Sequence, residues 1–266
     1  MANIGGLLIG FAILAAVLWP LERLWPALAG QPLWRRGSLT DLTYWFFTPL
    51  VTRAITRAAV IASVLALALA AGVPLDREHV QAFVAHPGPV VGGQPPWLQA
   101  IEILLLGDLI GYWSHRLFHG RTLWPFHAVH HSSTQVDWLS AVRLHPVNDV
   151  LSRLIQVVPI LLSGFSPALV AGYVPFLTFH AILLHANVPW TFGPLRYVIS
   201  SPAFHRWHHT TEAEGQDKNF AGLFPLVDLL FGTFYMPPGR QPRDFGVTGD
   251  PVPDGLWAQL CYPFHR

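Results

Sequence analysis

The stretch GDLIGYWSHRLFHGRTLWPFHAVHHSS, residues 107–133, contains five histidines, and HRWHH at residues 205–209 adds three more. Within each group the histidines are spaced i, i+4 or i, i+3, i+4, which brings them to one side of an α-helix. The sequence therefore predicts three helical faces lined with imidazoles. The eight residues are His115, His119, His127, His130, His131, His205, His208 and His209.

This clustering favours a site for more than one metal ion. A lone histidine is usually a surface or hydrogen-bonded core residue, but three groups in one helical register are hard to explain in that way. Imidazole binds iron, copper, zinc and nickel, and eight donors exceed the four that close a structural zinc site. We also expect His185, at the end of an apolar stretch, to reach the metals. His180 and His145 are possible additional ligands, and Pro146 disfavours a helix at His145.

The composition predicts a membrane protein. Hydrophobic residues make up 52% of the 266 residues and charged residues 12%, whereas soluble domains carry about 25% charge. The uncharged runs 4–21 and 58–75 have about the length of a membrane span. Residues 97–114 form a third candidate, and residues 150–186 suffice for two spans with a turn at 163–167. We expect an all-α, polytopic membrane protein of about four to five spanning helices.

The arginines indicate how these spans are oriented. They follow the first, third and last spans and precede the second, whereas the loop at residues 76–93 has only Arg77. The positive-inside rule then places the histidine groups on the cytoplasmic side. The apolar segment 42–51 is too short to span and is expected in the interface or as a re-entrant segment. The first run lacks a basic leader, which favours an uncleaved helix over a signal peptide.

We divide the chain into N-terminal membrane helices (1–96), a histidine-bearing domain (97–240) and a C-terminal tail (241–266). The bias to arginine, with Lys218 the one lysine, is typical of a GC-rich bacterial genome and suggests a bacterial inner membrane. The net charge of +1 gives no case for nucleic acid binding. The single Cys261 excludes an intrachain disulfide and a cysteine-ligated iron–sulfur cluster.

The three histidine groups, in the order H-x3-H, H-x2-HH and H-x2-HH, resemble those of the fatty acid hydroxylase superfamily, also called the sterol desaturase family. The likeness extends to RLHPVND at 143–149, HAN at 185–187 and DLLFGT at 228–233. Two positions depart from the family pattern. Val227 stands where the family often has tryptophan, and Ala221 interrupts its N-[YF]-G motif. These departures leave the histidines intact but weaken any transfer of substrate identity.

The resemblance implies a non-haem di-iron centre that uses O2 to hydroxylate or desaturate an unactivated C–H bond of a membrane lipid. Sterol, fatty acyl, carotenoid and ether lipids all stay open as substrates, as does the oligomeric state. Conventional acyl desaturases usually have a wider gap between their first two histidine groups, so the seven residues between His119 and His127 favour the hydroxylase side. Hydroxylation and desaturation both stay open, because both begin with the same hydrogen abstraction. The chain has no flavin, haem-domain or iron–sulfur signature, so electrons are expected from an external ferredoxin-like or cytochrome b5-like carrier.

Two other classes of membrane protein also agree with the sequence. A histidine-rich membrane metal transporter, or a metal-binding protein without oxygenase activity, would also combine imidazoles with spans, although a transporter holds its ligands near the bilayer midplane. A haem-binding cytochrome needs axial histidines but not three-histidine faces.

Asp108 lies two turns before His115 on one helix face. We expect its carboxylate to accept a hydrogen bond from a ligand imidazole; the alternative is a residue that reaches lipid headgroups. We also expect substrate to enter through an apolar groove lined by Gly111 and Ala181.

Overall fold

The computed structural model describes residues 4–85 and 90–265, and its regular secondary structure is helical. Within these residues no β-sheet forms, and an isolated backbone bridge joins Thr210 to Phe245. The predicted all-α class is confirmed. The elements are α1 (Ile4–Leu24), α2 (Ser38–Phe47), η1 (Thr48–Thr52), α3 (Arg53–Ala70), α4 (Arg77–Ala85), α5 (Pro96–Phe118), α6 (Trp124–His131), η2 (Trp138–Val142), α7 (Pro146–Leu162), α8 (Pro167–His185), η3 (Gly193–Tyr197), α9 (Pro202–His208), η4 (Ala213–Gly215), α10 (Leu226–Phe231), α11 (Leu256–Cys261) and η5 (Tyr262–Phe264).

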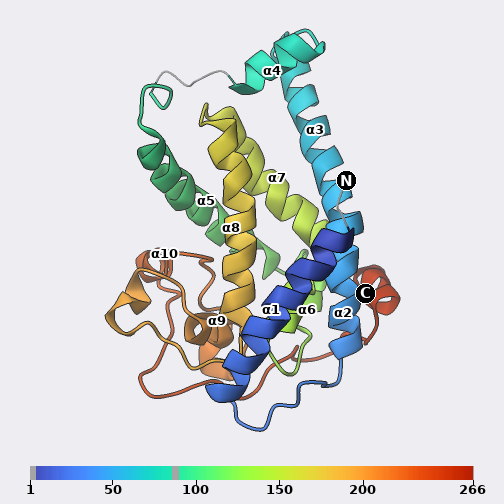
Figure 1. Ribbon diagram of the computed structural model, residues 1–266, viewed down its shortest axis with the longest axis vertical. Coiled ribbons are helices and arrows are strands. Elements are labelled where there is room, and N and C mark those ends of the chain that lie inside the picture. Colours follow the sequence, from blue (N-terminus) through green and yellow to red (C-terminus); the bar gives the residue numbers. More distant parts are fainter. Residues whose placement is uncertain (1–3, 86–89, 266) are drawn as a thin grey trace.

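The long helices run alternately towards and away from one end of the molecule (Figure 1). α1, α5 and α8 run towards the end that holds α6, α9 and α10, whereas α2–α3 and α7 run away from it, and α4 lies at the opposite end. α7 packs against both α3 and α5. This alternation delivers the C-terminal ends of α5 and α8, which carry histidines, to the same end of the molecule.

Among the described residues, three helical segments are long and apolar enough to cross a membrane, namely α1, Ser38–Ala70 and α8. A 21-residue helix such as α1 is about 31 Å long, which matches a hydrocarbon core of about 30 Å. α5 is interrupted by Glu102 and Asp108, and α7 has 17 residues. Large apolar side chains of α1 are exposed, as expected of a lipid-facing helix. They include Ile4, Leu8, Ile9, Ile13 and Val17.

The segment 42–51 differs from the expectation of a separate interfacial or re-entrant piece. It lies within α2 and η1 and continues without a break into α3, so that Ser38–Ala70 is one helical run of 33 residues. The π-helical turn η1 contains Pro49. Proline lacks an N–H and cannot join the regular α-helical ladder, and a π turn takes up such an interruption. The span therefore begins earlier than residue 58.

Aromatic packing and one buried carboxylate fix α1 to the rest of the fold. The ring of Trp138, in η2, lies 5.5 Å from that of Phe11 and 5.2 Å from that of Trp45. The carboxylate of Glu22 accepts hydrogen bonds from the backbone N–H of Trp138 (3.0 Å) and of Asn187 (2.8 Å). α1 is thereby tied to the residues that directly follow α8 and to the first residue of η2.

Candidate metal centre

Each histidine group is placed at the end of a helix. His115 lies in the last turn of α5 and His119 follows it as the C-cap residue. Pro125 and Pro202 occupy the first turns of α6 and α9, where the missing N–H costs nothing. α5 ends at Phe118 and α6 begins at Trp124, so the helix breaks between the first two groups. His209 is the C-cap residue of α9.

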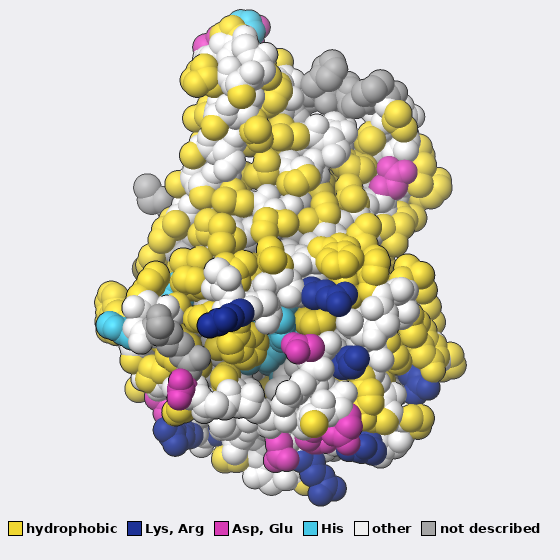
Figure 2. Space-filling view, turned by 180° about the vertical axis from the view of Figure 1, so that it is seen from behind, with side chains coloured by type: hydrophobic (Ala, Val, Ile, Leu, Met, Phe, Trp, Pro, Cys, Tyr) yellow, Lys and Arg dark blue, Asp and Glu magenta, His cyan; other side chains and the backbone are white. Residues whose placement is uncertain are grey.

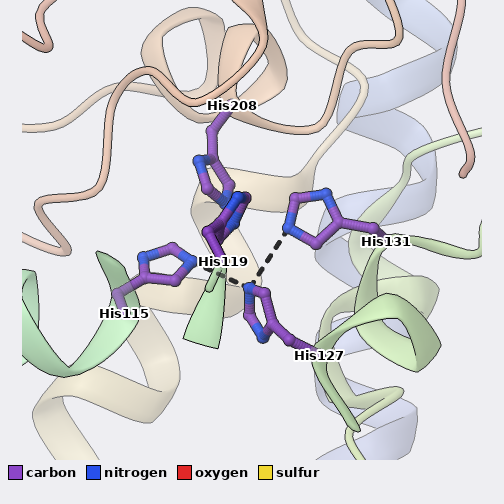
Figure 3. Close-up of side chains that lie close together, drawn as sticks. All are labelled: His115, His119, His127, His131 and His208. Carbon is purple, nitrogen blue, oxygen red and sulfur yellow. Dashed lines mark hydrogen bonds between the residues drawn. The ribbon is translucent and has the colours of Figure 1, made fainter. Parts of the chain in front are cut away.

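The imidazoles sort into two groups of donor atoms, each with its ring nitrogens within 4.8 Å of one another. We call them the five-histidine group and the four-histidine group. The members of the first come from α5, α6 and α9 and converge on one point (Figure 3). The second group draws on α6, α8 and α9, and includes His185 as expected. The five-histidine group is His115, His119, His127, His131 and His208, and the four-histidine group is His130, His185, His205 and His209.

The spacing of the inner nitrogens fits a metal ion in each group. Metal–nitrogen bonds of about 2.1 Å at angles near 90–110° separate neighbouring donors by about 3.0–3.4 Å. Two unprotonated Nε2 atoms cannot hydrogen-bond to each other, so their close approach favours a cation between them. The Nε2–Nε2 distances are 3.0 Å for His115–His127, 3.2 Å for His127–His131, 3.3 Å for His130–His185, 3.3 Å for His185–His205 and 3.0 Å for His205–His209.

The outer nitrogens explain why the Nε2 atoms point inward unprotonated. In six of the imidazoles Nδ1 lies within hydrogen-bond distance of an oxygen acceptor, and an Nδ1–H that donates to it leaves a lone pair on Nε2. This tautomer is inferred from the acceptors. The pairs are His115 with the Phe220 carbonyl (2.8 Å), His119 with Asp217 (2.9 Å), His127 with Asn148 (2.7 Å), His130 with the Arg143 carbonyl (3.0 Å), His185 with the Ala181 carbonyl (2.7 Å) and His208 with the Lys218 carbonyl (2.8 Å).

Burial keeps the imidazoles of α6 and α9 neutral. Desolvation, followed by the proximity of the other histidines, lowers the pKa of each well below its ordinary value. A neutral imidazole is the form that binds a metal, so these residues need not lose a proton first. The six are His127, His130, His131, His205, His208 and His209.

Asp108 has a different partner from the one predicted. Its carboxylate accepts hydrogen bonds from the backbone N–H groups of Gly222 (2.9 Å), Leu223 (2.8 Å) and Phe224 (2.8 Å), and not from an imidazole. Asp228 accepts in the same way from the N–H groups of residues 220 and 221, each at 2.8 Å. Two buried carboxylates therefore bind five consecutive amides. A carboxylate is satisfied equally well by amides as by imidazole N–H, and the loop partner lies too far along the chain to be read from spacing.

These two carboxylates act on the metal centre through the segment 217–224, which we call the acceptor loop. The loop supplies the outer acceptors of three members of the five-histidine group, through the side chain of Asp217 and the carbonyls of Lys218 and Phe220. Asp217 and Asn219 have positive φ angles of 53° and 60°, which side chains other than glycine adopt at a cost. The clamped amides hold this unfavourable backbone in place.

A buried ionic network supports the four-histidine group. Asp41 pairs with Arg35 (2.8 Å) and with Arg143 (2.6 Å), and Arg35 also pairs with Asp137 (2.7 Å). Asp137 caps η2 by accepting the backbone N–H of Ser140. Because the carbonyl of Arg143 is the acceptor for His130, the network links the loop before α2 to one ligand position. Sequence reasoning missed it, since its charges come from separate segments.

The two additional candidates lie outside both groups. His145 is the N-cap residue of α7, where Nδ1 accepts the N–H of Val147 (3.1 Å) and Nε2 lies 3.1 Å from the Leu260 carbonyl. The extended backbone at His145 agrees with the effect expected of Pro146. His180 lies on α8 with its ring stacked 6.3 Å from that of Phe176. Neither residue is therefore placed to share a metal ion with the grouped histidines.

A Cβ at Gly111 would meet Nε2 of Gln156, the flexible end of a side chain from α7. The expected apolar groove beside Gly111 and Ala181 stays a prediction. A separate cavity of about 810 Å³ reaches the five-histidine group, with His119, His131 and His208 in its wall. Figure 2 shows histidines in a hollow of the lower half, between charged side chains and just below the mostly apolar upper half.

Comparison with known proteins assigns the chain to a family. The family model named fatty acid hydroxylase matches residues 100–233, which is half of the chain and includes all nine grouped histidines. The chain therefore belongs to the fatty acid hydroxylase family, as the resemblance of its histidine groups predicted. No solved structure matches it.

The curated relatives are longer proteins that act on lipids or their derivatives, by name. The chain is 34% identical over 175 residues to the ornithine lipid hydroxylase OlsE of Rhizobium tropici, covering 64% of this chain and 52% of that protein. It is 31% identical over 171 residues to the alkylglycerol monooxygenase of Danio rerio, covering 63% and 36%. A very-long-chain aldehyde decarbonylase of Oryza sativa is 30% identical over 139 residues, covering 47% and 22%. The chain thus spans about half the length of the first relative and less of the others.

Proposed function

We propose that this chain is an O2-dependent, non-haem di-iron hydroxylase of a membrane lipid. The observation that carries the proposal is the division of nine imidazoles into two adjacent groups, each with the donor spacing that one ion requires. Membership of the fatty acid hydroxylase family supports the lipid substrate. Hydroxylation is favoured over desaturation because two of the relatives are named a hydroxylase and a monooxygenase.

Iron suits these residues better than zinc does. Imidazole is a ligand for both, but zinc has no redox chemistry. When bound, the two irons would supply the electrons and the oxidising power needed to activate O2. One oxygen atom is inserted into the C–H bond and the other leaves as water; an external ferredoxin-like or cytochrome b5-like carrier supplies two electrons, and two protons come from solvent. Hence we place iron in both groups, with the nine histidines as its ligands.

The protein's own residues perform three tasks in this proposal. The packing of α6, α8 and α9 keeps the four-histidine group away from the cavity and from bulk water, which protects the reactive site. The acceptor loop and the carbonyl of Arg143 hold the rings in orientation, and such outer partners tune metal affinity. The apolar helices keep the lipid chain beside the centre. From the arginine distribution we further propose that the centre faces the cytoplasm in a bacterial inner membrane.

Metal analysis and product analysis test the proposal together. Protein purified after iron-replete expression is expected to contain two irons per chain, and membranes that contain it should form a hydroxylated lipid when reductant and O2 are supplied. His208→Ala removes a ligand of the five-histidine group and should abolish turnover while the protein stays in the membrane. His180→Ala is the matched control, because this histidine lies outside both groups, and it should keep both irons.

Several results would contradict the proposal. One ion per chain, or zinc alone after iron-replete expression, would refute a di-iron centre. Metal-dependent uptake of ions into vesicles without O2 consumption would favour the transporter alternative. Zinc acquired during overexpression is distinguished by reconstituting the metal-free protein with ferrous iron.

A further inference from the structure

The cavity at the five-histidine group has an unusual inner wall for a protein that acts on lipids. His119, His131 and His208 line it, whereas no member of the four-histidine group does. The Nε2 atoms of His119 and His208 are buried and have no hydrogen-bond partner among the described residues. The cavity therefore ends at the lone pairs to which we assign iron, and it gives access to one of the two ions.

The rest of the lining is mixed, with slightly more polar than apolar surface. Hydroxyl and amide side chains face the space, and Trp124, Pro125 and Pro263 supply apolar surface. No leucine, isoleucine, valine or methionine lines it. A hydrocarbon chain placed here would cover several polar groups and remove them from water, which is unfavourable. The polar lining residues include Thr122, Thr210, Thr211, Gln216 and Thr248.

Two opposite charges stand in the same lining. Arg121 is exposed and forms no ion pair with any residue in the described part of the chain. The carboxylate of Asp217 contacts His119 through one oxygen at 2.9 Å, and its side chain is still 76% exposed. A guanidinium binds phosphate or carboxylate in a fork, and a carboxylate binds ammonium. The lining thus complements a molecule that carries both an anion and a cation.

Resting on the proposed function, we infer that this cavity binds the zwitterionic headgroup of the lipid substrate. Its anionic group contacts Arg121, its ammonium group contacts Asp217, and its acyl chains stay in the bilayer beside the apolar helices. A cavity of about 810 Å³ is within the range of sites that enclose a small ligand. Because the histidines form the cavity wall, the C–H bond that is oxidised lies within a few bonds of the headgroup and not in the middle of an acyl chain.

Binding of soluble headgroups to the iron-loaded, full-length protein in dodecyl maltoside tests this inference. The probes are glycerophosphoethanolamine, glycerol 3-phosphate and glycerol, and the dissociation constants are measured by saturation-transfer NMR. We expect the zwitterion to bind most tightly and Arg121→Gln to weaken it about tenfold. Arg243→Gln, an exposed arginine outside the cavity, should leave its affinity unchanged. Thr211→Trp, which fills part of the cavity, should abolish binding with the iron content intact.

The outcomes separate this inference from the proposed function. The headgroup site would be overturned by equal affinity for the zwitterion and for glycerol, or by tighter binding of glycerol 3-phosphate than of the zwitterion. Unchanged affinity for the zwitterion in Arg121→Gln and Thr211→Trp would overturn it as well. These outcomes hold even when two irons are bound and lipid is hydroxylated. Hydroxylation of free glycerophosphoethanolamine as fast as of the intact lipid would overturn the lipid part of the inference. If the unmodified protein binds the zwitterion selectively but holds no iron and hydroxylates no lipid, the proposed function alone is refuted.

Discussion

The role of Asp108 leads to a selective prediction for Asp108→Asn. The carboxylate accepts three backbone N–H groups at 2.8–2.9 Å, two on Oδ1 and one on Oδ2. In the less costly orientation of asparagine, its oxygen keeps the first two donors and its NH2 group faces the N–H of Phe224. One charge-assisted hydrogen bond is lost and two become neutral. With about 1.5–3 kcal/mol for a hydrogen bond to a charged group and about 1 kcal/mol for a neutral one, the acceptor loop loses about 2.5–7 kcal/mol.

This loss should weaken one metal site and spare the other. The acceptor loop orients His115, His119 and His208, so we expect the affinity of the five-histidine group to fall about 10–100-fold, as for other outer partners. The four-histidine group takes its acceptors from Arg143 and Ala181 instead.

Titration of metal-free protein with cobalt(II) against a competing chelator resolves the two affinities. The control is Asp76→Asn, because Asp76 is an exposed carboxylate in the loop before α4, at the opposite end of the molecule. Equal weakening of both sites would show that Asp108 supports the fold as a whole, and unchanged affinities would show that the loop does not orient the ligands.

Three further predictions concern pH, the buried network and orientation. The pKa values of the histidines in α6 and α9 lie below 6.5 in the folded chain, so the unfolded chain binds more protons below that pH. Metal-free protein should therefore lose stability as the pH falls below about 6.5, measured by thermal unfolding, and a flat profile would contradict the assigned burial. Asp41→Asn leaves Arg143 buried without its partner and should cost about 3–5 kcal/mol of unfolding free energy; Asp254→Asn, in an exposed ion pair, should change nothing measurable. The exposed Cys261 should react with an impermeant maleimide only after cells are permeabilised, whereas reaction in intact cells would reverse the proposed orientation.

Helical spacing predicts most of the centre because the histidines of each sequence cluster, 115–119, 127–131 and 205–209, lie within five residues of chain. The i, i+4 pairs, such as His127 with His131 and His205 with His209, do stay together in one metal group. His130 joins the other group from His131 because consecutive residues point about 100° apart around a helix. The sequence therefore contained a signal for the division into two groups, in that i, i+4 partners share an ion.

What the sequence could not predict depends on contacts between distant segments. The amides that Asp108 binds lie 114 to 116 residues later in the chain. Asp41 meets Arg143 across 102 residues, and neither periodicity nor composition reports such a pair. The sequence predicts two separate segments where the structure has the one helix Ser38–Ala70, because Arg53 and Arg57 separate its two apolar runs.

The two short helices α6 and α9 each contribute histidines to both groups, in opposite proportions. α6 gives two histidines to the five-histidine group and one to the other, whereas α9 gives one to the five-histidine group and two to the other. Neither group can thus be assembled while either helix is out of place. A substitution that displaces either helix should therefore weaken both metal sites, whereas Asp108→Asn, which acts through the acceptor loop, weakens one.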